Sequence, residues 1–419
     1  MRRFLRFSYE DLDGATRLPH TFRALKHRNF RLFWTSRIIS LTGNWMQTVA
    51  QGWLVYRLTD SPLYLGLVGF AQYLPVLLFA LFGGVLADRF PKRNLLIFTN
   101  AGALLQALAL AILTSTGQIQ VWQIIGLAFL LGTVQAFDIP TRQAIVMEMV
   151  GQDDLLNAIA LNSSAFNAAR TLGPAIAGIL VSTIGEAASF YLNALGFSVV
   201  IGALLRMRIP AGRYADLSGS VWARLKDGLR YARSNRTLLV LLSLVIVSSV
   251  FGISYGTLLP VFARDLLHAG PSGYGLLLSG TGLGALLAAL LLASRRRSRD
   301  KGRWLTLGNL LFPSMLLLLA ASRLFLLSWL ALFGVGFGLV LQNANVNVLL
   351  QTLSPERYRG RVMSLYALTF MGMLPLGSLQ AGAVANAYGA PVAVAAGALI
   401  CLLFGLVILL KKPQLRRLE

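Results

Sequence analysis

The segment that decides the fold is residues 83–93, which read GGVLADRFPKR. It lies between two apolar stretches, each long enough to cross a bilayer, that cover roughly 62–87 and 94–115. Its paired glycines let a helix end pack closely against a neighbour. The cations that follow cannot enter hydrocarbon, so the segment reaches a membrane surface. Its lone carboxylate, Asp88, is costly at that depth unless a cation or a helix N-terminus faces it.

The composition excludes an ordinary soluble domain. Of 419 residues, 56% are hydrophobic and 13% are charged, and the mean hydropathy is +0.66. A helix of roughly 20 apolar residues crosses the hydrocarbon layer. Twelve such segments are present, at approximately 32–56, 62–87, 94–115, 121–138, 157–182, 187–207, 237–262, 272–294, 304–321, 324–348, 361–386 and 390–410. We therefore predict an all-α polytopic membrane protein with twelve transmembrane helices in two six-helix bundles.

The formal net charge of +22 is unevenly distributed. Of the 38 Lys and Arg residues, 33 fall in the first 31 residues, in the connections that follow even-numbered spans, and after residue 410. Lys and Arg are enriched in this way in the cytoplasmic connections of inner-membrane proteins, so both termini are predicted to be cytoplasmic. The cations are expected to contact anionic membrane lipids. We expect no nucleic-acid partner.

The longest polar segment divides the spans into two sets of six. The predicted organisation is a basic cytoplasmic arm (1–29), an N-terminal bundle (30–207), a cytoplasmic interfacial linker (208–236), a C-terminal bundle (237–410) and a cytoplasmic tail (411–419). In the linker, apolar and basic residues alternate with a helical period, which favours an amphipathic helix on the membrane surface. Glycine-rich second spans that end in basic loops occur in both halves, as in transporters built from repeats.

The loop after the second span resembles the signature loop of the major facilitator superfamily, pattern G-x-L-A-D-R-x-x-K/R-R. The matching residues are Gly84, Leu86, Ala87, Asp88, Arg89, Lys92 and Arg93. The chain is most similar to the drug and siderophore branch, which includes enterobactin-exporter-like and macrolide-efflux-like proteins. In that family the acid faces the start of span 11 when the cytoplasmic side is closed.

The resemblance implies a latch that stabilises the outward-open state. Its predicted members are Gly84, Asp88, Arg89, Arg93, Asp138 and Arg361. We place Asp138 at the cytoplasmic end of span 4, within reach of Arg89 or Arg93. The alternative interpretation is a charged loop that only fixes the topology.

A second motif lies in span 5, where residues 169–178 read ARTLGPAIAG. Small residues at intervals of four allow close helix contact, and a proline permits a bend. The segment resembles the signature of exporting members of the superfamily, and its predicted motif residues are Arg170, Gly173, Pro174 and Gly178. The resemblance favours export over uptake, although ordinary small-residue packing explains the same pattern.

Polar side chains within the spans predict a substrate pathway, because such groups usually face a wet cavity. The predicted pathway residues are Arg37, Asn44, Gln47, Gln51, Asn162, Asn167, Tyr255, Gln342, Asn343, Asn345 and Gln380. Hydrogen bonding between helices is the alternative for part of this set. The arginines Arg37 and Arg170 favour an anionic or zwitterionic substrate.

The predicted function is secondary active export of a small amphipathic compound, such as a drug, siderophore or secondary metabolite, by alternating access. No acid lies near the centre of a predicted span, which argues against proton antiport, although antiport stays open as the coupling mechanism. One cysteine, three scattered histidines and no nucleotide-binding loop lead us to expect no metal site, no cofactor and no ATP requirement. We expect a monomer. The alternatives are a same-fold importer or lipid transporter, and a polytopic membrane enzyme or sensor.

Overall fold

The computed structural model describes residues 20–208, 221–294 and 300–412, and all regular structure in these ranges is helical. The first half contains a short 3₁₀ helix, η1 (His20–Lys26), and six long helices, α1 (Arg28–Thr59), α2 (Pro62–Arg89), α3 (Lys92–Ser115), α4 (Val121–Val150), α5 (Leu155–Thr183) and α6 (Glu186–Arg206). The predictions for the first 19 residues, and for 209–220, 295–299 and 413–419, lie outside the described residues.

The second half begins with the linker helix α7 (Val221–Ser234). The seventh crossing is made of α8 (Arg236–Val247), η2 (Ser248–Gly252), α9 (Tyr255–Val261) and η3 (Phe262–Leu266). The remaining crossings are α10 (Gly270–Ser294), α11 (Lys301–Ala321), α12 (Phe325–Leu353), the pair α13 (Glu356–Met371) and α14 (Leu374–Tyr388), and α15 (Ala390–Lys411).

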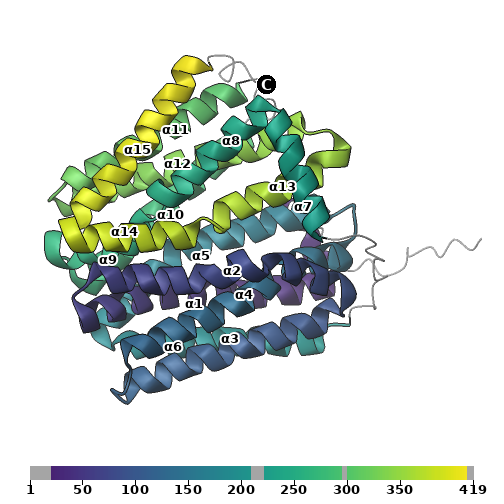
Figure 1. Cartoon of the computed structure of the whole chain (residues 1–419). Helices are drawn as coiled ribbons and strands as arrows, with labels where there is room; N and C mark the ends of the chain where they lie inside the picture. The colour runs from purple at the N-terminus through teal and green to yellow at the C-terminus, as the bar shows by residue number, and fades with distance from the viewer. Residues whose placement is uncertain (1–19, 209–220, 295–299, 413–419) are drawn as a thin grey trace, which may run out of the picture.

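These helices confirm the predicted fold class. Ten segments among the described residues are long and apolar enough by themselves to cross a membrane. The two other long helices, α1 and α5, have the required length but are more polar, and they carry many of the predicted pathway residues. In Figure 1 the first-half helices fill the lower part of the view and the second-half helices fill the upper part. We call the membrane face at which α1 begins and α15 ends the terminus side, and the opposite face the far side.

One predicted boundary is wrong. Helix α4 continues to Val150, twelve residues beyond the end predicted at residue 138, so Asp138 lies within the helix and not at its end. The polar residues after position 137 resemble a loop, but they are followed by buried Ile145, Val146 and Met149. These side chains join a core cluster on the terminus side with residues of α1, α3, α5 and α6. Packing therefore extends the helix beyond its apolar run.

Small residues lie at two contacts between the two halves, where α5 packs against α10 and α2 packs against α14. At the first seam, a methyl group on Gly178 would lie 2.8 Å from the carbonyl oxygen of Pro271. At the second seam, a methyl group on Gly66 would lie 2.7 Å from the carbonyl oxygen of Ser378. Glycine is needed at both positions because any larger side chain would separate the helix backbones.

The residues that precede α1 are attached to the connection between α4 and α5. Asp154 is the N-cap of α5 and is only 2% exposed. Its carboxylate oxygens lie 2.9 Å from Arg23, 2.7 Å from Lys26 and 2.8 Å from His27. The basic arm therefore ends in an anchored turn. Hydrogen bonds from Lys26 and His27 hold the pKa of the Asp154 carboxyl below its ordinary value of 3.8.

We predict that Asp154→Asn lowers the melting temperature of the purified protein at pH 7, because the variant lacks the charge that holds three cationic side chains. A carboxyl with a lowered folded-state pKa stabilises the fold above its ordinary pKa, and this contribution is lost as the pH falls through the folded-state value. The difference between variant and wild type should therefore shrink below about pH 4. Thermal unfolding curves across pH measure this, and a difference that persists unchanged at low pH would contradict the assignment.

Candidate functional site

A cavity of about 820 Å³ lies between the two halves, bounded by α2, α4 and α13. Its terminus-side end is lined by charged residues, namely Asp88 at the end of α2 and Glu356, Arg357 and Arg361 at the start of α13. Its inner end is lined mainly by apolar residues and one amide, which include Val76, Leu77, Ala136, Phe370, Met371 and Gln135. The cavity therefore combines a charged mouth on the terminus side with an apolar interior.

A second, smaller cavity of about 50 Å³ adjoins the first, because Gln135 lines both. Its other lining residues are Asn44, Gln47, Thr48 and Gln51 from α1, Gln72 from α2 and Leu131 from α4. We call this cavity the amide pocket. The structure thus brings together three predicted pathway residues, Asn44, Gln47 and Gln51. Sequence reasoning missed Gln72 and Gln135, although each is an isolated amide within an apolar span.

The predicted latch residues are separated in this conformation. Asp88 and Arg361 line the same cavity, but Asp88 has no ion pair among the described residues. The guanidinium of Arg361 instead lies 3.4 Å from the carboxylate of Asp227 on α7. The rings of Tyr231 on α7 and Tyr358 on α13 stack at 4.3 Å between centroids, which attaches the linker helix to the start of the eleventh crossing. Gly84 and Arg89 flank Asp88 on α2, and Gly84 also lines the cavity.

Asp138 has partners other than the predicted ones. Its carboxylate pairs with Arg142 at 2.8 Å, one turn further along α4, and accepts hydrogen bonds from Thr99 and Asn100. Arg93 donates to the carbonyl oxygens of Leu204 and Leu205 at 2.7 and 2.8 Å. The predicted Asp138 contact with Arg89 or Arg93 is therefore replaced by a pair within one helix. Arg142 can pair with Asp138 because α4 continues past both residues, which places their side chains one turn apart on the same helix.

The span 5 motif lies at the contacts of α5 with both halves. A methyl group on Gly173 would lie 2.7 Å from the Cβ of Trp45 on α1, so only glycine permits this approach. The guanidinium of Arg170 lies 5.9 Å from the centroid of the Trp45 ring. The carbonyl oxygen of Pro174 would lie 2.2 Å from a methyl group on Gly275 of α10. The motif therefore packs helices together, as its small residues predict.

Eight of the predicted pathway residues line neither cavity in this conformation. They are Arg37, Asn162, Asn167, Tyr255, Gln342, Asn343, Asn345 and Gln380. Asn345 donates to the Leu341 carbonyl oxygen at 2.7 Å, and Asn167 donates to the Ser163 carbonyl oxygen at 2.9 Å, each within its own helix. These two bonds lie within one helix, so they are not the bonds between helices that the alternative interpretation expects. A pathway role for the set stays a prediction.

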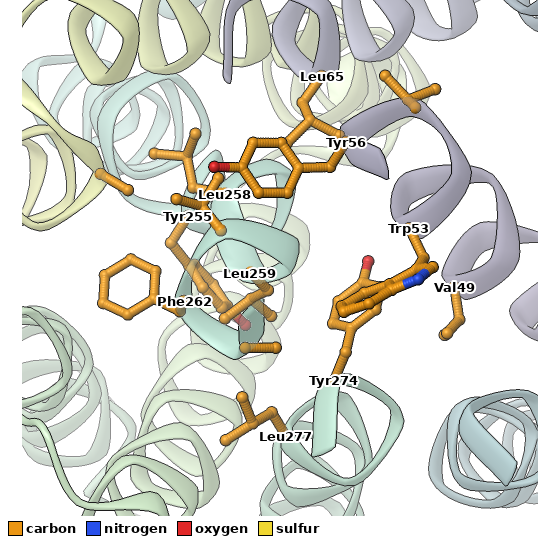
Figure 2. Packing of buried hydrophobic residues seen from close by; sticks show 14 of the residues in the cluster. Val49, Trp53, Tyr56, Leu65, Tyr255, Leu258, Leu259, Phe262, Tyr274 and Leu277 are labelled. Carbon is orange, nitrogen blue, oxygen red and sulfur yellow. The ribbon is translucent and has the colours of Figure 1, made fainter. Parts of the chain in front are cut away.

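The far side is closed by a buried aromatic and aliphatic cluster that both halves contribute to. Figure 2 shows Trp53 and Tyr56 from α1 facing Tyr255 and Phe262 of the seventh crossing and Tyr274 of α10. The Trp53 and Tyr274 rings are stacked with centroids 6.4 Å apart. Burial of these large side chains between the halves favours contact on this side.

Polar contacts at the rim of this cluster join the same two halves. The hydroxyl of Tyr56 donates a hydrogen bond to the carboxylate of Asp265. Arg264 forms an ion pair with Asp60 at 2.6 Å and lies over the ring of Tyr56, 5.2 Å from its centroid. None of these four residues was predicted to act in gating. Their separation in sequence, more than 200 residues, left no local signal.

We predict that Tyr56→Phe weakens this closure, because it removes the donor to Asp265 and keeps the ring. A cysteine at position 49 (Val49→Cys, fully buried in the cluster) in a Cys401→Ser background reports opening through its labelling rate by a membrane-impermeant maleimide. Loss of one hydrogen bond to a charged group should raise labelling about tenfold. Tyr191→Phe is the control, because its hydroxyl contacts Ser115 within the first half. Equal labelling in both variants would contradict the role of Tyr56.

The chain is similar in sequence to known membrane transporters along most of its length. The family model described as transmembrane secretion effector matches residues 20–419. The staphyloferrin A transporter of Staphylococcus aureus is 26% identical over 367 residues, which is 86% of this chain and 90% of that protein. The multidrug efflux pump Tap of Mycolicibacterium fortuitum is 28% identical over 389 residues, which is 90% of this chain and 94% of that protein.

Among solved structures, the crystal structure of the peptide transporter POT superposes with a TM-score of 0.74, at 16% identity, over 93% of this chain and 95% of that one. That likeness supports the fold. The relatives and the family are transporters, so the enzyme alternative is not retained. The chain is an integral membrane protein of the transmembrane secretion effector family, in the drug and siderophore efflux branch of the major facilitator superfamily.

Proposed function

We propose that the protein exports a small amphipathic compound from the cytoplasm by alternating access, and that the terminus side faces the cytoplasm. The observation that carries the proposal is the large cavity between the halves on the terminus side, together with the far-side cluster that joins them. The excess of cations in terminus-side connections supports the orientation. The proposed state is therefore ready to take up substrate from the cytoplasm.

The composition of the cavity supports an amphipathic substrate. Apolar residues line its interior, and charges of both signs lie at its mouth. A volume of about 820 Å³ is within the range of pockets that bind drug-sized ligands. The relatives named for a siderophore and for multidrug efflux are consistent with such a compound. Neither Arg37 nor Arg170 lines the cavity, so the structure offers no support for the anionic substrate that these arginines suggested.

We predict that inside-out vesicles containing the protein accumulate a transported compound without ATP, because export from the cytoplasm then runs into the vesicle lumen. The measurement is uptake of a panel of radiolabelled antibiotics and siderophores, with and without an imposed pH gradient. Accumulation that depends on the gradient would establish proton coupling. Accumulation only in right-side-out vesicles would contradict export and support the importer alternative.

The latch is proposed to form when the terminus side closes. Arg361 pairs with Asp227 of the linker helix in the present state, and Asp88 faces the same cavity without an ion partner among the described residues. Movement of α13 toward α2 would bring the start of α13 and Arg361 to Asp88, where the helix N-terminus adds to the attraction. Asp88 and Asp227 would then be alternative partners of one guanidinium.

We predict that Asp88→Asn lowers the initial rate of export about tenfold at unchanged expression, because the closed terminus side loses a charge-assisted contact. Asp227→Asn should act oppositely on the conformational equilibrium and favour the closed terminus side. Asp300→Asn is the control, since its partner Arg303 is exposed and lies in the same terminus-side region. Transport rates in vesicles measure the effect, and a normal rate for Asp88→Asn would refute the latch.

A further inference from the structure

Four of the amide side chains that line the amide pocket are bonded to no other described residue. The side chains of Asn44, Gln51, Gln72 and Gln135 converge on it, and none has a hydrogen-bond partner among the described residues. Gln51 is only 5% exposed. The other three amides are partly exposed. Because none of the four is bonded to another helix, their donors and acceptors are free to bind a group that is not part of the chain.

Gln47 provides an internal comparison within the same pocket. Its amide nitrogen donates to Gln106 at 3.1 Å, and its amide oxygen accepts from Asn193 at 2.8 Å. Gln47 therefore joins α1 to α3 and α6 and has a structural role. The four unpaired amides have no such bonds to neighbouring helices. Helix packing explains the first kind of amide and does not explain the second.

The pocket also lies deep in the membrane-spanning region. Asn44, Gln72 and Gln135 are near the middle of α1, α2 and α4 respectively, far from the charged helix ends at the cavity mouth. None of the seven lining residues carries a titratable group. A charged ligand group placed there would lose its hydration with no opposite charge in the pocket to compensate, so charged groups are disfavoured. An uncharged group that donates and accepts hydrogen bonds would find partners for both functions.

We propose that the amide pocket binds the uncharged, hydroxyl- or amide-bearing end of the exported compound, while the apolar body occupies the larger cavity. Its size, about 50 Å³, suits one small polar group that replaces a few waters. Gln135 lines both cavities and marks the position where polar end and apolar body meet. This inference rests on the proposed function, and it names the four amides as residues that determine substrate specificity.

The test uses three fluorescent probes with the same apolar body and different ends. N-dansyl-ethanolamine carries a neutral hydroxyl end, N-dansyl-ethylenediamine a cation and N-dansyl-glycine an anion, and the three ends are of similar size. Binding to the purified protein in lipid nanodiscs is measured by the dansyl fluorescence increase, with empty nanodiscs subtracted. The neutral probe should bind at least about tenfold more tightly than either charged probe, because only its end is matched by the pocket.

Variants separate recognition from packing. Gln135→Leu and Gln72→Leu should each weaken the neutral probe about tenfold while leaving the melting temperature unchanged or raised, because no protein hydrogen bond is lost. Gln47→Leu should instead lower the melting temperature, since Gln106 and Asn193 lose their partner. Gln135→Glu should shift the preference toward the cationic probe. Gln118→Leu, at an exposed position between α3 and α4 that lines neither cavity, is the control and should bind like wild type.

These experiments test the binding role of the amide pocket independently of the proposed export function. A preference for a charged probe, equal binding of all three, or no binding of any probe would overturn it. Unchanged binding by Gln135→Leu and Gln72→Leu, or a loss of melting temperature in both, would also overturn it and assign the amides to packing. Export measured in inside-out vesicles would stand in all of these cases, whereas failure of export with intact probe discrimination would refute the proposed function alone.

Discussion

The hydrocarbon layer offers no hydrogen bonds, and this constraint governs where the protein places its polar side chains. A polar group at that depth has to pair within the protein or face a cavity that admits water or ligand. Both cases occur on helix α1, one turn apart. Gln47 is hydrogen-bonded to Gln106 and Asn193, whereas Gln51 faces the amide pocket. The charges of the large cavity remain at helix ends, where water reaches them.

The two halves are in contact through different groups at the two membrane faces. On the far side, stacked aromatic rings such as Trp53 and Tyr274 are reinforced by the Tyr56 hydrogen bond to Asp265 and by the Arg264 ion pair. On the terminus side, the charges of Asp88 and Arg361 face a shared cavity. Alternating access needs contacts that break on one side as others form on the opposite side. The glycine seams that join α5 to α10 and α2 to α14 hold the helix backbones of the two halves close together.

Part of the site could be predicted from the sequence, and the reason differs for each residue. Asn44, Gln47 and Gln51 recur at helical spacing, so their shared face follows from the chain alone. The span 5 motif predicts close helix packing, because small residues have few other uses in a span; its members are Gly173, Pro174 and Gly178. In this conformation Asp138 pairs with Arg142 and not with Arg89 or Arg93, because α4 continues past position 138 and its later residues are buried against four other helices. Gln72 and Gln135 gave no signal beyond their isolation in apolar spans.

The sequence by itself determined that the chain is a membrane protein of helices, where most of those helices begin and end, and which residues belong to a recognisable loop. These are local properties, set by runs of apolar residues and by charge at their ends. Only the tertiary structure decided that Asp265 contacts Tyr56, that Asp227 contacts Arg361, and that five amides from three helices line one pocket. These contacts depend on the rotation of each helix about its axis, which is set by packing against helices that are distant in sequence.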